Sequence, residues 1–150
     1  MAEPKARCIL VCEDDPAMTR IFQFLLRQQG IRKVINTENG EHVTRMAKSD
    51  KPDLILLDLM LPGKDGLTVL KELKQNEETR FIPVIVVSGK EAQEQVRQAM
   101  MAGAIDYVIK PFEPMELGSR IKSFLETLDA TAPEPPAVQT PPSGANLGGL

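Results

Sequence analysis

The stretch CILVCEDDP, residues 8–16, decides the fold class. A short, continuous run of apolar residues is followed at once by three acids, Glu13, Asp14 and Asp15, and then by Pro16. Such a run is typical of a strand that is buried on both faces of a sheet. Asp15 followed by proline has the pattern of a helix N-cap with proline in the first turn. The stretch therefore predicts a buried strand, an acidic strand end and a helix in close succession.

Apolar runs and amphipathic segments alternate along the whole of the following chain. Between the runs, apolar residues recur at the three- to four-residue spacing of helices that bury one face. This alternation, with short connections, indicates an α/β domain in which helices cover both faces of a parallel sheet. The second run is more polar than the others, which predicts an edge strand. The predicted strands are 8–12, 31–36, 54–57, 84–87 and 105–109. The predicted helices begin near Pro16, Gly40, Asp65 and Ala92, and a last helix has an apolar stripe from Leu117 to Leu128.

The bulk composition excludes several classes of protein. With 150 residues, 42% hydrophobic and 26% charged, the chain has the make-up of an ordinary soluble domain. A net charge of −3 and the lack of a Lys/Arg-rich run argue against direct binding of nucleic acid. No segment approaches the roughly 18 apolar residues of a membrane span, and no signal peptide is evident, so we expect a cytoplasmic protein that contacts no membrane.

The composition changes after residue 128. The segment DATAPEPPAVQTPPSGANLGGL, residues 129–150, is rich in proline and glycine and has no aromatic residue. Such a segment cannot bury enough apolar surface to offset the entropy of ordering it. We therefore expect a folded domain over 1–128 and a disordered tail or linker over 129–150.

Polar residues gather where the predicted strands end. In open parallel sheets, ligands bind outside the carboxyl ends of the strands, so these residues are candidates for one site. A small group of carboxylates with open positions suits Mg²⁺. A hydroxyl and a lysine beside such a metal suit the oxygens of a phosphoryl group. The residues at the strand ends are Glu13, Asp14 and Asp15 after the first strand, Asp58 after the third, Ser88 after the fourth and Lys110 after the fifth.

This set of acidic pair, aspartate, serine and Lys-Pro, each at its own strand end, resembles the receiver domain of two-component response regulators. It is close to the chemotaxis-type single-domain regulators, and the resemblance runs from residue 7 to about residue 128. It implies a flavodoxin-like (βα)5 doubly wound sheet with strand order 2-1-3-4-5. It also implies a phospho-accepting signalling switch rather than an enzyme, one that catalyses only its own phosphotransfer and dephosphorylation.

The resemblance assigns a role to each acidic position. Asp58 matches the phospho-acceptor, whose carboxylate attacks the phosphorus of a phosphohistidine. The donor would be a sensor histidine kinase or a histidine phosphotransfer protein. Asp15 and Asp58 would be direct Mg²⁺ ligands, Asp14 would act mainly through bound water, and the backbone carbonyl of Met60 would complete the protein ligands.

The remaining positions match groups that hold the phosphoryl group. Lys110 would pair first with the acceptor carboxylate and later with a phosphoryl oxygen. Ser88 would donate to another phosphoryl oxygen, and Gly89 follows it in the same loop. Pro111 resembles the family's cis proline, which would hold Lys110 in place.

Tyr107 matches the family's switch aromatic on the fifth strand. The resemblance implies that Ser88 moves toward the phosphoryl group and that Tyr107 then turns inward. The face formed by the fourth helix, the fifth strand and the fifth helix would change as a result. An output protein, whose identity the sequence does not give, would bind or leave that face.

Three other classes of protein share some of these features. A flavodoxin-like electron carrier would need a first loop that cradles a phosphate, and the acids of residues 13–15 would repel one. A Mg²⁺-dependent phosphohydrolase shares phosphoaspartate chemistry, but its nucleophile follows the first strand, whereas Asp58 follows the third. A receiver-like interaction domain that works without phosphorylation usually lacks one or more of the five positions, and all five are present here.

Overall fold

The computed structural model describes residues 7–131, which fall into two compact units, 7–118 and 119–131. The first unit holds the sheet, four helices and the start of α5 (Pro114–Thr131), and the second holds the rest of α5. The strands are β1 (Cys8–Cys12), β2 (Lys33–Thr37), β3 (Leu54–Leu57), β4 (Val84–Ser88) and β5 (Asp106–Ile109). The helices are α1 (Pro16–Gln28), α2 (Val43–Asp50), α3 (Gly66–Gln75) and α4 (Gln93–Ala102), with a short 3-10 helix, η1 (Gly40–His42), before α2.

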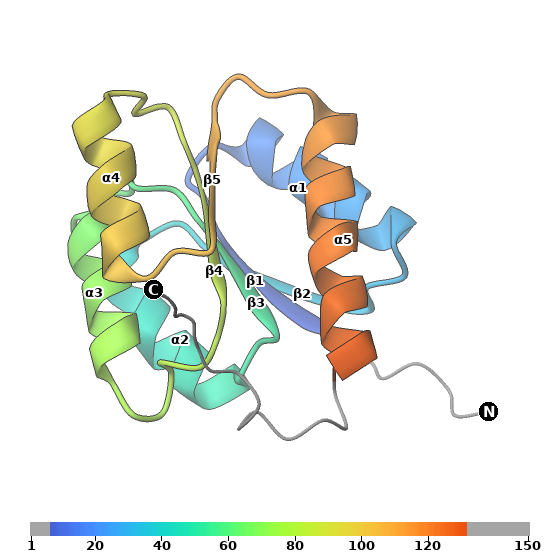
Figure 1. The fold of residues 1–150 in the computed structure, drawn as a ribbon, viewed down its shortest axis with the longest axis horizontal. Helices are drawn as coiled ribbons and strands as arrows, with labels where there is room; N and C mark the ends of the chain where they lie inside the picture. The colour runs from blue at the N-terminus through green and yellow to red at the C-terminus, as the bar shows by residue number, and fades with distance from the viewer. Residues whose placement is uncertain (1–6, 132–150) are drawn as a thin grey trace, which may run out of the picture. The chain divides into compact units, whose positions relative to one another are not determined.

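The five strands form one parallel sheet in the order β2-β1-β3-β4-β5, which confirms the predicted fold class and strand order. Figure 1 shows α1 on one side of this sheet and α2, α3 and α4 on the other. The register pairs Cys12 with both Thr37 and Leu57, and Leu57 with Val86. The carboxyl ends of β2, β1, β3 and β4 therefore lie side by side along one edge of the sheet.

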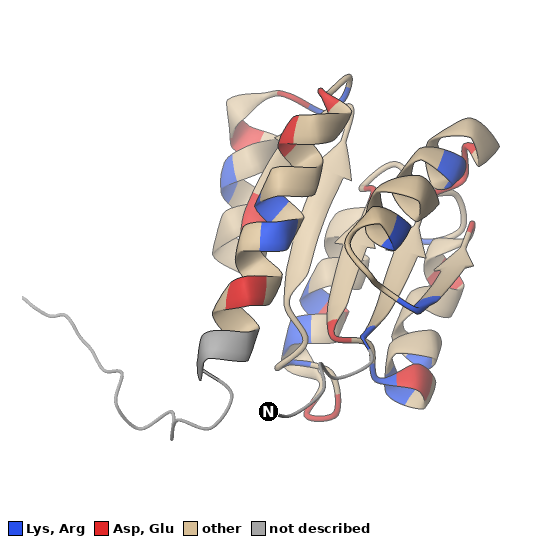
Figure 2. Ribbon diagram, turned by 90° about the vertical axis from the view of Figure 1, so that its right-hand side faces the viewer, with Lys and Arg blue, Asp and Glu red and all other residues tan. Residues whose placement is uncertain are grey.

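The central strands are buried on both faces, as their continuous apolar runs predict. Every residue of β3 and β4 is buried, and so are the last four residues of β1. In Figure 2 the strands are almost free of charged residues, which lie on the helices and in the loops. Because successive side chains point to opposite faces, such strands place one half of their side chains in each helical layer.

The edge strand β2 begins two residues later than predicted. Gly30 has a left-handed φ of 82°, and the backbone N–H of Ile31 bonds back to the carbonyl of Leu26 at 3.1 Å. Ile31 is therefore part of the turn that ends α1, and its buried side chain packs there instead of starting the strand. Its apolar character made it look like the first residue of β2.

The predicted starts of α1, α3 and α4 are confirmed to within one residue, whereas the helix expected near Gly40 begins as η1 and becomes α2 only at Val43. The carboxylate of Asp15 accepts a hydrogen bond from the N–H of Ala17 at 3.0 Å, with Pro16 in the first turn of α1. Asp65 caps α3 in the same way by accepting from the N–H of Thr68 at 3.2 Å. Gly103 ends α4 with a φ of 116°, a conformation that costs glycine little.

The predicted tail, residues 129–150, lies almost entirely outside the described residues, so the predicted domain boundary at 128 stays a prediction. Helix α5 continues to Thr131. Among the helices of the described residues, none combines the length and the apolar character that crossing a bilayer requires.

The two cysteines of β1 differ in burial, and we expect them to differ in reactivity. Cys12 is 1% exposed, and burial raises the pKa of its thiol, whereas Cys8 is half-buried. The thiolate is the reactive form, so iodoacetamide should label Cys8 more than about tenfold faster than Cys12 in the folded protein. Intact mass should show one adduct under native conditions and two in denaturant. Equal labelling of both thiols in the folded protein would contradict the buried position of Cys12.

Candidate functional site

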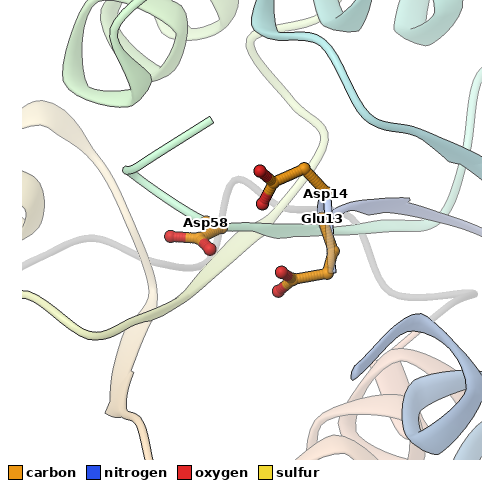
Figure 3. Close-up of side chains that lie close together, drawn as sticks. All are labelled: Glu13, Asp14 and Asp58. Atoms are coloured by element: carbon orange, nitrogen blue, oxygen red, sulfur yellow. The ribbon is translucent and has the colours of Figure 1, made fainter. Parts of the chain in front are cut away.

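The ends of β1 and β3 bring three acidic side chains together. The backbone N–H of Asp58 donates to the carbonyl of Cys12 at 3.1 Å, which ties the residue after β3 to the last residue of β1. Carboxylate oxygens of Glu13, Asp14 and Asp58 all lie within 4.8 Å of one another. Figure 3 shows the three side chains reaching into the same space. The predicted convergence of acids at this edge of the sheet is therefore present in the structure.

Lys110 joins two of these acids from the end of β5. Its Nζ donates to Glu13 Oε1 at 2.7 Å and to Asp58 Oδ2 at 2.8 Å. The side chains of Glu13 and Asp58 are only 1% and 6% exposed, so the ammonium is the cation that balances two nearly buried carboxylates. Charges so little solvated are stable only when they are paired and hydrogen-bonded.

The pKa values of this group follow from burial and pairing. Burial raises the pKa of the Glu13 carboxyl above its ordinary value, although the hydrogen bonds from Lys110 and from the backbone of Asp15 oppose this. Burial alone would lower the pKa of the Lys110 ammonium, but its hydrogen bonds to Asp58 and Glu13 outweigh burial and raise it. Lys110 is therefore charged throughout the physiological range.

Asp15, which the resemblance placed among the direct metal ligands, is not part of the group of close carboxylates. Its side chain caps α1 instead, and its backbone N–H donates to Glu13 Oε2 at 3.1 Å. The two acids next to Asp58 are Glu13 and Asp14. This pair lies one residue earlier in the chain than the pair Asp14 and Asp15 that the resemblance implied. Glu13 is the member of this group that the sequence-based ligand set did not include. Its place as the first residue after the apolar run was the available signal.

The loop between β3 and α3 orients the carboxylate of Asp58. The backbone N–H of Met60 donates to Asp58 Oδ1 at 2.9 Å, while Oδ2 faces Lys110. The loop then closes where the N–H of Gly66 donates to the carbonyl of Leu59 at 3.2 Å. A Cβ on Gly66 would overlap the backbone of Leu59, so only glycine allows this approach. Both oxygens of Asp58 therefore have defined partners, and Met60 lies in the loop predicted to supply a backbone ligand.

The donor set fits Mg²⁺. Magnesium prefers oxygen ligands and is usually held by a few carboxylates while it keeps several waters. Glu13 and Asp58 are nearly buried and Asp14 is exposed, so the group has a solvent-facing side on which waters can complete the coordination. Three carboxylates against one lysine leave an excess of negative charge, which a divalent cation would neutralise.

The family model of the response regulator receiver domain matches residues 9–122 of the chain. The chain belongs to this family. It is a receiver domain of the kind found in two-component signalling systems. Receiver domains are signalling switches rather than classical enzymes.

Curated relatives agree with this assignment. The chain is 38% identical over 129 residues to the phosphate regulon transcriptional regulatory protein PhoB of Escherichia coli, which covers 86% of this chain and 56% of PhoB. It is 40% identical over 114 residues to the transcriptional regulatory protein KdpE of Staphylococcus aureus, which covers 76% of this chain and 48% of KdpE. The chain spans about half the length of these relatives.

Solved structures of receiver domains share the fold. The receiver domain of a sensor histidine kinase from Pseudomonas aeruginosa is 32% identical, with a TM-score of 0.70, covering 80% of this chain and 97% of that one. It was crystallised with a magnesium ion coordinated in its active-site cleft. A response regulator from Chloroflexus aurantiacus is 31% identical, with a TM-score of 0.74, covering 81% and 99%. Magnesium is therefore the metal that both the donor set and a structural neighbour indicate for the receiver domain.

The ends of β4 and β5 bring the other predicted site residues of the receiver domain together. Ser88 is fully buried, its carbonyl accepts from the N–H of Lys110 at 2.9 Å, and its Oγ accepts from the N–H of Lys90 at 3.4 Å. The hydroxyl of Tyr107 donates to the carbonyl of Lys90 at 2.6 Å. Burial raises the pKa of Tyr107, and a hydrogen bond with the Ser88 side chain opposes this. Ser88, Lys90 and Tyr107 therefore form one connected group beside the acidic site.

Gly89 and Pro111 complete the predicted set. A Cβ on Gly89 would lie 4.0 Å from the sulfur of Met60, so the loops after β3 and β4 approach each other here. The peptide bond between Lys110 and Pro111 is cis, the form that the resemblance implied.

Proposed function

We propose that Asp58 is the phospho-acceptor of this receiver domain. The observation that carries the proposal is the pairing of Lys110 with Glu13 and Asp58 at a strand edge that also holds Asp14. In the reaction, an oxygen of Asp58 attacks the phosphorus of a phosphohistidine, a P–O bond forms and the P–N bond to the imidazole breaks. The donor is a sensor histidine kinase or a histidine phosphotransfer protein. Lys110 stabilises the oxygens of the transferred group.

We further propose that Glu13, Asp14 and Asp58, with the backbone carbonyl of Met60, hold Mg²⁺. When bound, the metal reduces the repulsion between the attacking carboxylate and the anionic phosphoryl group. Asp15 stays outside this ligand set because it is not in the group of close carboxylates, and its Oδ1 caps α1 instead. The same site would catalyse dephosphorylation, in which water attacks phosphorus and the carboxylate of Asp58 leaves.

Output from the site is proposed to pass through Ser88 and Tyr107. When Ser88 moves to donate to a phosphoryl oxygen, its hydrogen bond from the N–H of Lys90 changes, and this alters the contact between Tyr107 and the carbonyl of Lys90. The face affected comprises α4, β5 and α5. On β5 and in the first turn of α5, Ile109 and Met115 are exposed by 39% and 81%, which suits binding of an output protein.

The test is intact mass after incubation with a small-molecule phosphodonor in the presence of Mg²⁺ or a chelator. We expect one phosphoryl adduct that forms only with Mg²⁺ and that an Asp58→Ala variant lacks. Asp14→Asn should need a Mg²⁺ concentration about tenfold or more higher to form the adduct, because the loss of a charged ligand weakens metal binding.

Asp15→Asn is the matched control, since asparagine caps a helix as well as aspartate does. It should bind Mg²⁺ and accept the phosphoryl group as the unaltered protein does. An adduct that forms equally on Asp58→Ala, or no adduct on a folded protein that binds Mg²⁺, would overturn the assignment of Asp58. If Asp15→Asn lost Mg²⁺ binding and Asp14→Asn kept it, Asp15 would be the ligand in place of Asp14.

A further inference from the structure

The loop after Asp58, residues 59–65, rests directly on the loop after β2. The N–H of Gly40 donates to the carbonyl of Pro62 at 2.9 Å. A Cβ on Gly40 would overlap the carbonyl oxygen of Lys64, and a Cβ on Gly63 would overlap the side-chain oxygen of Asn39. The two loops therefore touch backbone to backbone at Gly40 and Lys64, and Gly63, on the other side of the contact, has a left-handed φ of 92° that favours glycine.

An ion pair holds the same loop from the helix that follows it. Nζ of Lys64 donates to both carboxylate oxygens of Glu72 on α3, at 3.1 Å and 2.9 Å. The hydroxyl of Thr44 on α2 donates to Glu72 Oε1 at 3.3 Å. The side chains of Lys64 and Glu72 are 35% and 38% exposed, so the pair is partly shielded from water. Lys64 is thus fixed to α3 through Glu72, which Thr44 in turn links to α2, next to the contact between Lys64 and Gly40.

The loop after β2 also reaches the acidic end of β1. The carbonyl of Thr37 accepts from the N–H of Glu13 at 3.0 Å, and the Thr37 hydroxyl oxygen accepts from the N–H of Asn39 at 3.2 Å. Residues 37–40 are therefore bonded on one side to the strand end that carries Glu13 and Asp14. On the other side they are bonded to the loop that carries Met60. The acid at the end of β2, Glu38, is exposed and is not in the group of close carboxylates, so this segment contributes to the site by connecting its two halves.

We propose that residues 37–40 and the Lys64–Glu72 pair form a clamp that positions the loop of residues 59–65 for metal binding. The clamp acts through Met60, whose N–H orients Asp58 Oδ1 and whose carbonyl is the proposed backbone ligand. Lys64, Glu72 and Gly40 are positioning residues and touch neither metal nor substrate. The metal-binding part rests on the proposed function, whereas the effect on the loop itself does not.

The test measures the Mg²⁺ dissociation constant by calorimetry and amide hydrogen exchange over residues 59–66 in metal-free protein. Partly exposed ion pairs have modest strength, so Lys64→Met should weaken Mg²⁺ binding about two- to fivefold and speed exchange in this loop. Glu72→Gln keeps an acceptor for Thr44 and should have the same effect. The double variant should weaken Mg²⁺ binding and speed exchange no more than either single variant does, because both substitutions remove the same interaction. Gly40→Ala forces the loops apart and should weaken binding about tenfold or more.

Lys33→Met is the matched control, because it makes the same chemical change at a pair with Asp50 whose distance is 3.8 Å, away from this loop. It should change neither measurement. If Lys64→Met binds Mg²⁺ and exchanges like the unaltered protein, the clamp is refuted, and this variant decides the point even if Gly40→Ala does not fold. If Asp58→Asn binds Mg²⁺ as tightly as the unaltered protein does, the proposed metal site is refuted. The exchange data still test the clamp in that case.

Discussion

An Asp58→Asn variant should accept a phosphoryl group more than about a thousandfold more slowly than the unaltered receiver domain, because its amide is a poor nucleophile. The fold should survive the change. The carbonyl oxygen of asparagine can still accept from the N–H of Met60, the partner of Asp58 Oδ1. The rate of adduct formation with Mg²⁺ and a small phosphodonor, followed by intact mass, measures the effect.

Asp65→Asn is the matched control for this result. Asp65 lies in the same loop, and its carboxylate caps α3, a role that asparagine fills equally well. It should be modified at the rate of the unaltered protein. An Asp58→Asn variant that still gains the adduct at a comparable rate would place the acceptor elsewhere in the chain.

A Lys110→Met variant should lose stability in metal-free buffer and regain it when Mg²⁺ is added. The change keeps an unbranched side chain only one atom shorter than lysine but leaves Glu13 and Asp58 without their cation. Removing one partner of a buried ion pair costs roughly 3–5 kcal/mol, and the partial exposure of Lys110 reduces this to about 2–3 kcal/mol. The metal site then has one more unbalanced negative charge, so Mg²⁺ should bind more tightly than in the unaltered protein.

The measurement is the free energy of unfolding in urea, with a chelator and with saturating Mg²⁺. The stabilisation by Mg²⁺ should be larger in Lys110→Met than in the unaltered protein, while the rate of phosphoryl acceptance falls because a partner of the phosphoryl oxygens is missing. Lys33→Met makes the same substitution at an exposed lysine and should change unfolding by well under 1 kcal/mol. Equal responses to Mg²⁺ in Lys110→Met and the unaltered protein would show that Lys110 and the metal do not share the carboxylates.

Asp15 shows where prediction of the site from sequence reached its limit. The chain offered two uses for this residue, as the cap of a helix that begins with proline and as a metal ligand. The cap is a local hydrogen bond over two residues, and it was predicted correctly. The choice between Asp14 and Asp15 as neighbour of Asp58 depends on where β1 stops and in which direction the chain leaves the sheet. Neither is encoded in the run of three acids.

The sequence by itself determined the elements of this protein and the kind of chemistry at its strand ends. Runs such as LILL and VIVV became buried strands, and capping residues set the helix ends, because apolar periodicity and capping act over a few neighbouring residues. The strand order came from the resemblance to receiver domains. The resemblance also implied that Lys110 pairs with Asp58. Only the tertiary structure decided that Glu13 shares this lysine, because Lys110 reaches Glu13 across 97 residues of chain through the register of the parallel sheet. The clamp between residues 37–40 and the loop after Asp58 was likewise decided there, since close packing of two backbones leaves no periodic pattern in the sequence.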